Sequence, residues 1–169
     1  MTSRPKQTDD LSPLERKRLR RLIDEDDIRK LIVQYSHCLD HGYIEQMRDL
    51  FTEDICCQFG PYGDWRGIDA VIKNFKAVFT SLGGMPFASM HAVSNHWINF
   101  SHADQASGRR QLMDFLLTKA PDENPLLWLA VYDETYTRDA TGWRIASITV
   151  ELLWPERHAS EGFPKQFPA

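Results

Sequence analysis

Apolar residues in the first half of the chain recur at the spacing of amphipathic helices. The clearest stripe runs over residues 28–39, before Gly42, which suits a helix C-terminus. Its members are Ile28, Leu31, Ile32, Tyr35 and Leu39. The same pattern predicts a short helix over 44–50 and a third helix over 68–82, where two glycines follow.

Beyond residue 88 the period of the pattern changes from 3.6 to 2. This alternation predicts strands over 90–100, 107–119, 126–138 and 142–154, separated by the turn segments HADQ, APDENP and RDATG. A shorter strand is expected over 55–59, before the turn-rich GPYGDWRG. Helices followed by long antiparallel strands indicate an α+β fold, whose sheet can curl around the helices and enclose a pocket.

Charge is distributed unevenly along the chain. Residues 1–22 carry a net charge of +4, whereas the remaining residues carry −8. The sequence Ser12-Pro13-Leu14-Glu15 predicts a helix start, with Ser12 as N-cap. The basic run that follows could bind a polyanion or form a solvated helical extension. Because no aromatic residues interleave with its charges, we favour the solvated extension.

Length and composition limit the chain to few classes of protein. Its 169 residues support one compact domain, and a net charge of −4 argues against a nucleic-acid partner. No apolar run is long enough to cross a bilayer, and the first residues lack a signal peptide's apolar segment. Three cysteines, two of them adjacent, do not suggest a disulfide framework. We therefore expect a cytoplasmic location and no membrane partner.

The order of several motifs resembles the SnoaL-like branch of the NTF2-like superfamily. These motifs are YSHCLDHGYIEQMRDLFTEDICC, WRGIDAVIKNF, MHAVSNHWI and YDETYTRDATGWRIASITVELLW. The resemblance implies a cone-shaped α+β barrel, with three N-terminal helices packed in a curved, mostly antiparallel sheet around an apolar pocket. It also implies a homodimer or higher homo-oligomer. We divide the chain into a basic extension (1–23), a SnoaL-like domain (24–154) and a proline-rich tail (155–169).

Four residues are candidates for acid–base chemistry. Asp40 falls in the last turn of the first predicted helix, where the helix dipole disfavours a carboxylate, so its placement suggests a role other than helix stability. The resemblance implies that His91, at the start of the first long strand, pairs with Asp40 and acts as a general base. Asp114 is an acid within an apolar strand and is either a second pocket carboxylate or an outward-facing partner of an arginine. Tyr35 is a weaker candidate as a hydrogen-bond donor, because a core tyrosine fits its place equally well.

Further residues are candidates to line the pocket. Strict alternation places Asn95 and Trp97 on the same face as His91, and His96 on the opposite face. Aromatic side chains could line a cavity for a ring-containing substrate, although any one of them could equally fill the core. The predicted substrate-binding residues are Asn95, Trp65, Tyr62, Phe51, Trp97 and Tyr132.

Other classes of site receive less support. His37 and His41 have a helical spacing that can hold zinc, but no third ligand follows at a clear spacing, so we expect no metal and no cofactor. The sequence and the resemblance together predict a cofactor-independent lyase, specifically a dehydratase of a small hydrophobic cyclic substrate. An isomerase or cyclase of the same fold is the first alternative. The second is a non-catalytic binding or assembly subunit resembling the small subunit of ring-hydroxylating dioxygenases.

Overall fold

The computed structural model describes residues 11–118, 120, 122–123 and 126–164. Its helices are α1 (Pro13–His41) and α2 (Ile68–Ser81), with two 3₁₀ helices, η2 (Ile44–Leu50) and η3 (Gly60–Tyr62). The strands are β1 (Phe51–Gln58), β2 (Asp64–Arg66), β3 (Ser89–Phe100), β4 (Gln105–Leu116), β5 (Leu126–Arg138), β6 (Trp143–Trp154) and β7 (His158–Ala159). The predicted α+β class is confirmed, and the second predicted helix is a 3₁₀ helix.

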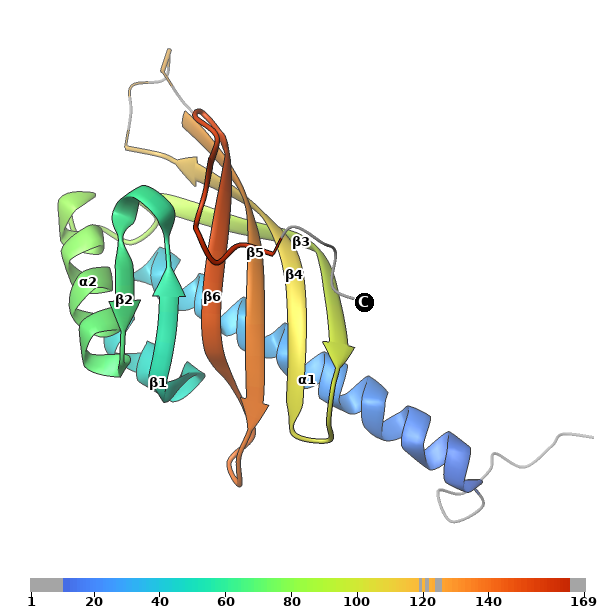
Figure 1. Ribbon diagram of the computed structural model, residues 1–169. Helices are drawn as coiled ribbons and strands as arrows, with labels where there is room; N and C mark the ends of the chain where they lie inside the picture. Colours follow the sequence, from blue (N-terminus) through green and yellow to red (C-terminus); the bar gives the residue numbers. More distant parts are fainter. Residues whose placement is uncertain (1–10, 119, 121, 124–125, 165–169) are drawn as a thin grey trace, which may run out of the picture.

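All strands belong to one curved mixed sheet that does not close on itself. Its order is β2-β1-β6-β5-β4-β3, with β7 paired to β6. The pairs are antiparallel except for β1 and β6, which run parallel. The helix α1 crosses one face of the sheet, and α2 lies beside β1 and β2 (Figure 1). The core therefore lies between the α1 side of the sheet and the helices.

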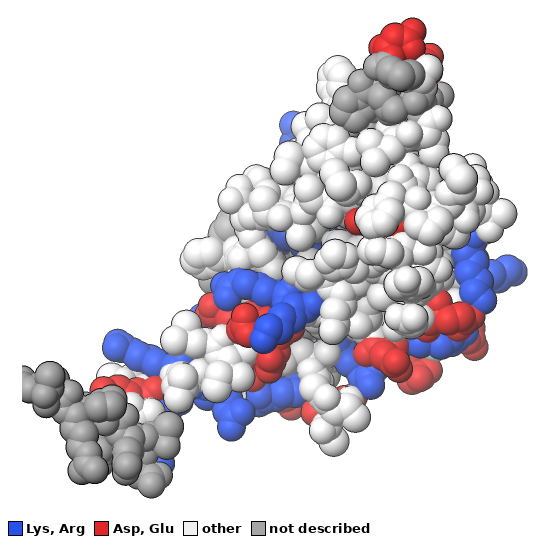
Figure 2. Space-filling view, turned by 180° about the vertical axis from the view of Figure 1, so that it is seen from behind, with Lys and Arg blue, Asp and Glu red and all other residues white. Residues whose placement is uncertain are grey.

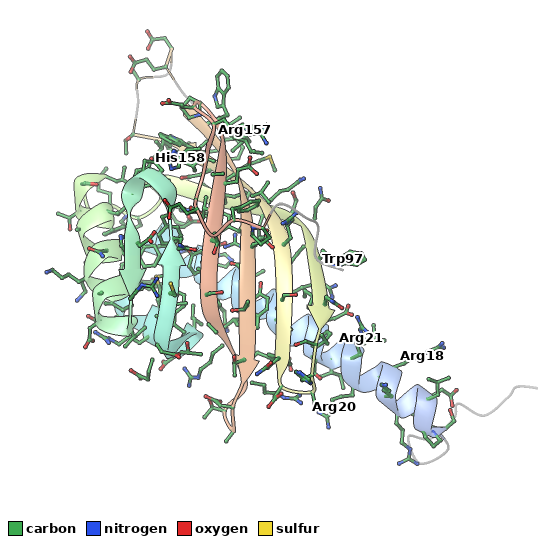
Figure 3. All side chains as sticks on the ribbon, viewed as in Figure 1. Arg18, Arg20, Arg21, Trp97, Arg157 and His158 are labelled. Atoms are coloured by element: carbon green, nitrogen blue, oxygen red, sulfur yellow. The ribbon has the colours of Figure 1, made fainter. Side chains whose placement is uncertain are left out.

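The helix α1 joins the basic extension to the domain without a break. It begins at the predicted N-cap, where the Ser12 hydroxyl accepts from the Glu15 N–H and the Glu15 carboxylate accepts from the Ser12 N–H. Its first turns project beyond the sheet and carry exposed basic residues, three of which are labelled in Figure 3. The predicted solvated helix is confirmed for residues 13–23, and residues 1–10 lie outside the described part.

A glycine ends α1 immediately after the predicted site residue Asp40. Gly42 adopts φ +75°, a left-handed conformation that favours glycine, and its N–H donates to the carbonyl of Leu39. A Cβ atom at this position would approach the Phe79 ring to 2.3 Å. The close packing of α2 against this turn thus requires glycine, and it places Asp40 at the end of the core.

The strand β3 contains a bulge that the alternation pattern did not predict. Its register with β4 shifts between Ser94 and Trp97, and Asn95 adopts φ +49°. The expected shared face is therefore wrong beyond the bulge. His96 turns into the interior, whereas Asn95 bonds to Gln111 on the opposite face and Trp97 is 51% exposed. Figure 3 shows Trp97 projecting outward from β3.

The described part of the proline-rich tail is attached to the sheet. The strand β7 pairs with β6, and the Ser160 hydroxyl hydrogen-bonds the carbonyl oxygens of Gln58 and Val150. Further along, the Arg109 guanidinium donates to the Pro164 carbonyl. Residues 165–169 lie outside the described residues.

Candidate active site

Asp40 and His91 meet at the end of α1 and the start of β3. The His91 Nδ1 atom lies 2.6 Å from Asp40 Oδ1, and the His91 backbone N–H donates to the same carboxylate at 3.1 Å. Both side chains are largely buried, with exposures of 14% and 8%. A proton on Nδ1 is the tautomer that satisfies this contact, and it leaves the Nε2 lone pair available to accept a proton.

Asp114 lies across the strand from His91. The two residues are direct register partners on β4 and β3, and His91 Nε2 is 3.9 Å from Asp114 Oδ2. Burial raises the pKa of Asp114; the positive charge of His91 opposes this rise, and the charge of Asp40 adds to it. The carboxyl group therefore holds its proton more readily than an exposed aspartate does. Asp114 lies on the same face of the sheet as His91, and its role as a pocket carboxylate stays a prediction.

Tyr35 lies deeper in the core than this cluster. Its ring is 2% exposed and contacts the rings of Phe51 and Phe75 at right angles. Burial raises the pKa of Tyr35 well above its ordinary value, so its hydroxyl remains protonated. The predicted donor role of Tyr35 stays a prediction.

A buried ion pair next to Tyr35 was not predicted from the sequence. The Arg110 guanidinium donates to the Glu134 carboxylate at 2.9–3.1 Å, and both side chains are almost inaccessible to solvent. The Arg110 Cζ atom lies 4.2 Å from the centroid of the Tyr132 ring and 5.3 Å from the centroid of the Tyr35 ring. The alternation of buried positions on β4 includes Arg110, but a charged residue there does not itself indicate burial.

The ion pair continues into a chain of hydrogen bonds. The Tyr136 hydroxyl donates to Glu134 at 2.6 Å and lies 3.1 Å from His96 Nε2. Burial lowers the pKa of His96 to about 4, so this ring is neutral, and a hydrogen on Nε2 can donate to the Tyr136 oxygen. Room for His96 depends on Gly108, because a Cβ there would lie 3.1 Å from the imidazole.

The predicted aromatic lining residues are distributed between the core and its edge. Phe51 and Tyr132 are buried, and Trp65 packs edge-on against Phe59 and Phe75. Tyr62 is 52% exposed, with its ring centroid 6.2 Å from that of Trp128. Asn95 and Trp97 lie on the far face of the sheet, outside this interior.

The surface on the α1 side is uneven in charge. Charged side chains gather on its lower part and along α1, whereas its upper part is largely uncharged (Figure 2). Met85 and Phe87 are exposed in the connection before β3, where the Phe87 N–H donates to the Asp40 carbonyl. Exposed apolar side chains therefore lie close to the Asp40 end of the helix.

His37 and His41 do not form part of a larger group of metal ligands. Their rings lie 5.9 Å apart, and the His41 Nδ1–H donates to the His37 carbonyl. No group of three His, Cys, Asp or Glu side chains suited to a metal occurs within the residues that the structure describes.

With this geometry established, comparison with known proteins identifies the family. The profile of the SnoaL-like domain family matches residues 20–149, which is most of the chain. The chain belongs to the SnoaL-like domain family. The match begins within the projecting part of α1 and ends in β6, so this SnoaL-like domain contains all four candidate acid–base residues.

Several solved structures share the fold at low sequence identity. One is a putative scytalone dehydratase from Novosphingobium aromaticivorans (TM-score 0.69, 19% identity, covering 86% of this chain and 98% of that one). Another is hexachlorocyclohexane dehydrochlorinase LinA-type3 from Novosphingobium barchaimii (TM-score 0.68, 17% identity, covering 89% and 99%). An NTF2-like protein with a cystatin-like fold, also from N. aromaticivorans, has a TM-score of 0.70 at 22% identity, covering 89% and 94%.

Two further comparisons concern curated proteins and membranes. The SnoaL-like chain has no match among the curated proteins. Within the described residues, no helix combines the length and the apolar character that crossing a membrane requires.

Proposed function

We propose that this SnoaL-like protein is a cofactor-independent dehydratase that eliminates water from a hydrophobic cyclic β-hydroxy ketone. The observation that carries the proposal is the arrangement of His91 between two carboxylates in unlike environments. Asp40 is hydrogen-bonded to Nδ1, whereas Asp114 faces Nε2 at 3.9 Å with a raised pKa. One carboxylate therefore orients the base, and the other is suited to donate a proton.

The elimination assigns one proton transfer to each side of the substrate. His91 Nε2 removes a proton from the carbon beside the ketone, and the electrons of that C–H bond form an enolate. The enolate re-forms the ketone as the C–O bond of the β-hydroxyl breaks, and Asp114 protonates the departing oxygen. The products are an unsaturated ketone and water. The proton on His91 then returns to the Asp114 carboxylate, which restores both groups.

Asp40 contributes by holding the imidazole in one tautomer and by stabilising its positive charge. Its carboxylate accepts from both the ring and the backbone N–H of His91, so the ring has little rotational freedom. Tyr35 is assigned a secondary role as a donor in the pocket. The names of two structural neighbours, a dehydratase and a dehydrochlorinase, denote eliminations and support this class of reaction.

The test uses a substrate whose product is easily seen. The β-hydroxy derivative of α-tetralone loses water and tautomerises to fluorescent α-naphthol, so wild-type turnover is followed by emission. We expect His91→Gln to lower kcat about 10²–10⁴-fold, as for loss of a general base. Asp40→Asn should also reduce kcat, and His102→Gln, which changes an exposed loop residue, is the matched control.

Two results would contradict the proposal. Turnover by His91→Gln within twofold of wild type would exclude His91 as the base. A wild-type protein that dehydrates neither this compound nor other cyclic β-hydroxy ketones would not be a dehydratase of this class. The isomerase or cyclase alternative would then be tested with a β,γ-unsaturated ketone, and inactivity there would favour a non-catalytic binding subunit.

The setting of the reaction is also part of the proposal. We infer a cytoplasmic protein that acts as a homodimer or larger homo-oligomer, because the sheet face opposite α1 exposes apolar side chains such as Met90 and Met113. Sedimentation equilibrium of the full chain measures this directly, and a monomeric mass at micromolar concentration would contradict it.

A further inference from the structure

Two buried polar atoms beside His91 have no partner among the described residues. They are Asp114 Oδ1 and the indole nitrogen Trp128 Nε1. The indole N–H can only donate a hydrogen bond, and a buried donor without an acceptor is rare in folded proteins. The two residues are direct register partners on β4 and β5, so their side chains are neighbours on the sheet.

These residues extend the catalytic pair into a row across three strands. His91 on β3 pairs with Asp114 on β4, which pairs with Trp128 on β5. All three occupy the face of the sheet that lies toward the core. Since neighbouring strands are about 4.8 Å apart, the Cα atoms of His91 and Trp128 are separated by roughly 10 Å, with Asp114 midway.

The row supplies one group for each reacting position of a β-hydroxy ketone. His91 is a base for the C–H beside the carbonyl, Asp114 is an acid for the hydroxyl, and Trp128 offers an N–H for the carbonyl oxygen. Asp114 lies between the other two residues, so the acid is adjacent both to the base and to the N–H donor.

We propose that the Trp128 indole N–H binds the carbonyl oxygen of the substrate and stabilises the enolate oxygen as the proton leaves. This inference rests on the proposed dehydratase function and assigns it a residue that the sequence did not suggest. A donor directed at an oxygen on which negative charge develops lowers the barrier more than it tightens ground-state binding. The ligand class is a cyclic ketone, whose carbonyl oxygen would accept the hydrogen bond from the Trp128 indole.

Access to the indole nitrogen involves Tyr62. The Trp128 indole nitrogen is buried, and the half-exposed Tyr62 ring packs against the Trp128 ring. Tyr62 belongs to the short η3 turn, which is followed by Gly63 at φ +95°. Movement of the Tyr62 side chain would open a path for the carbonyl without disturbing the sheet.

The experiment observes the indole group directly. In protein with isotope-labelled tryptophan, NMR resolves the indole N–H resonances, and the Trp128 signal is the one missing from Trp128→Phe. We expect α-tetralone, which has the carbonyl but cannot eliminate water, to shift this signal downfield. Tetralin, which lacks the carbonyl, should not do so, and the Trp97 signal on the far face should not respond to either ligand.

Affinity and kinetics separate hydrogen bonding from packing. Trp128→Phe keeps an aromatic ring, and its fold is checked by near-ultraviolet circular dichroism. We expect this variant to weaken α-tetralone binding about 3- to 10-fold, to leave tetralin binding unchanged, and to lower kcat for the β-hydroxy substrate. Equal losses for both ligands, absence of α-tetralone binding, or a Trp128 signal that does not move at saturation would overturn the proposal.

The two proposals fail in different ways. His91→Gln should lose turnover yet retain the Trp128 shift with α-tetralone, because ketone binding does not need the base. A retained shift together with undiminished His91→Gln turnover refutes the His91 mechanism and leaves the ketone site intact. Normal His91-dependent turnover without any Trp128 shift refutes the ketone site and leaves the dehydratase.

Discussion

Asp40 and Asp114 are both largely buried aspartates, but their hydrogen-bonding surroundings differ. The Asp40 carboxylate accepts hydrogen bonds from the backbone and the ring of His91. Asp114 has one oxygen without a described partner and another 3.9 Å from the imidazole. Desolvation of a poorly compensated carboxylate favours its neutral form. His91 therefore has a hydrogen-bonded carboxylate on one side and, on the other, a carboxyl group whose pKa is raised by burial.

The raised pKa of Asp114 predicts how stability depends on pH. Its ordinary value is 3.8, and burial raises it in the folded chain. A raised folded-state pKa means that the stability contributed by the protonated form is lost as pH rises through that value. Asp114→Asn does not titrate, so its advantage in free energy of unfolding should grow from acid toward neutral pH. Urea unfolding of both proteins across a pH series measures this, and an advantage that shrinks with pH would contradict it.

Among the elements, α1 contains both exposed and anchored segments. Residues 12–23 are almost entirely exposed, whereas Asp24 is buried and accepts from Arg138 at 2.6 Å and from the Trp143 indole at 3.2 Å. The helix is thus attached to β5 and β6 from Asp24 onward. The helix continues without a break through residue 23, and the predicted boundary there stays a prediction.

This difference predicts unequal effects of two changes in α1. Removing residues 1–20 should alter the free energy of unfolding by less than about 1 kcal/mol, because few buried contacts are lost. Asp24→Ala should cost about 2–4 kcal/mol, since it leaves the Arg138 charge and the Trp143 donor without their acceptor. Thermal and urea unfolding compare the two variants. A larger loss of stability from the truncation than from Asp24→Ala would show that the basic extension is part of the stable domain.

The sequence predicts elements that depend on residues near one another in the chain. It does not predict features that depend on how the strands pair. The start of α1 depends on adjacent residues, Ser12 to Glu15, and the strand over 126–138 depends on simple alternation; both are confirmed. The bulge at Asn95 arises from pairing with β4, which alternation within β3 cannot indicate. For the same reason Trp128 was overlooked, because only the register of three strands places it in line with His91.

At the scale of the whole molecule, two polar groups of the described interior lie at different levels of the sheet. The row of His91, Asp114 and Trp128 lies at one level of the sheet. Arg110 lies four residues along β4 from Asp114, about 13 Å in an extended strand, and forms its ion pair with Glu134 of the neighbouring β5. Removing either partner of such a buried ion pair leaves an uncompensated charge, whereas replacing both with apolar residues does not.

The ion pair therefore predicts strong coupling between two substitutions. Arg110→Met and Glu134→Leu should each cost about 3–5 kcal/mol, and the double variant should be more stable than either, because Tyr136 keeps His96 as a partner. Additive losses in urea unfolding would contradict this coupling.

Turnover of the double variant then separates two roles of Arg110. Arg110 lies over the rings of Tyr35 and Tyr132, so a stable but slow double variant would identify it as a positioning residue, and unchanged kcat would restrict it to stability.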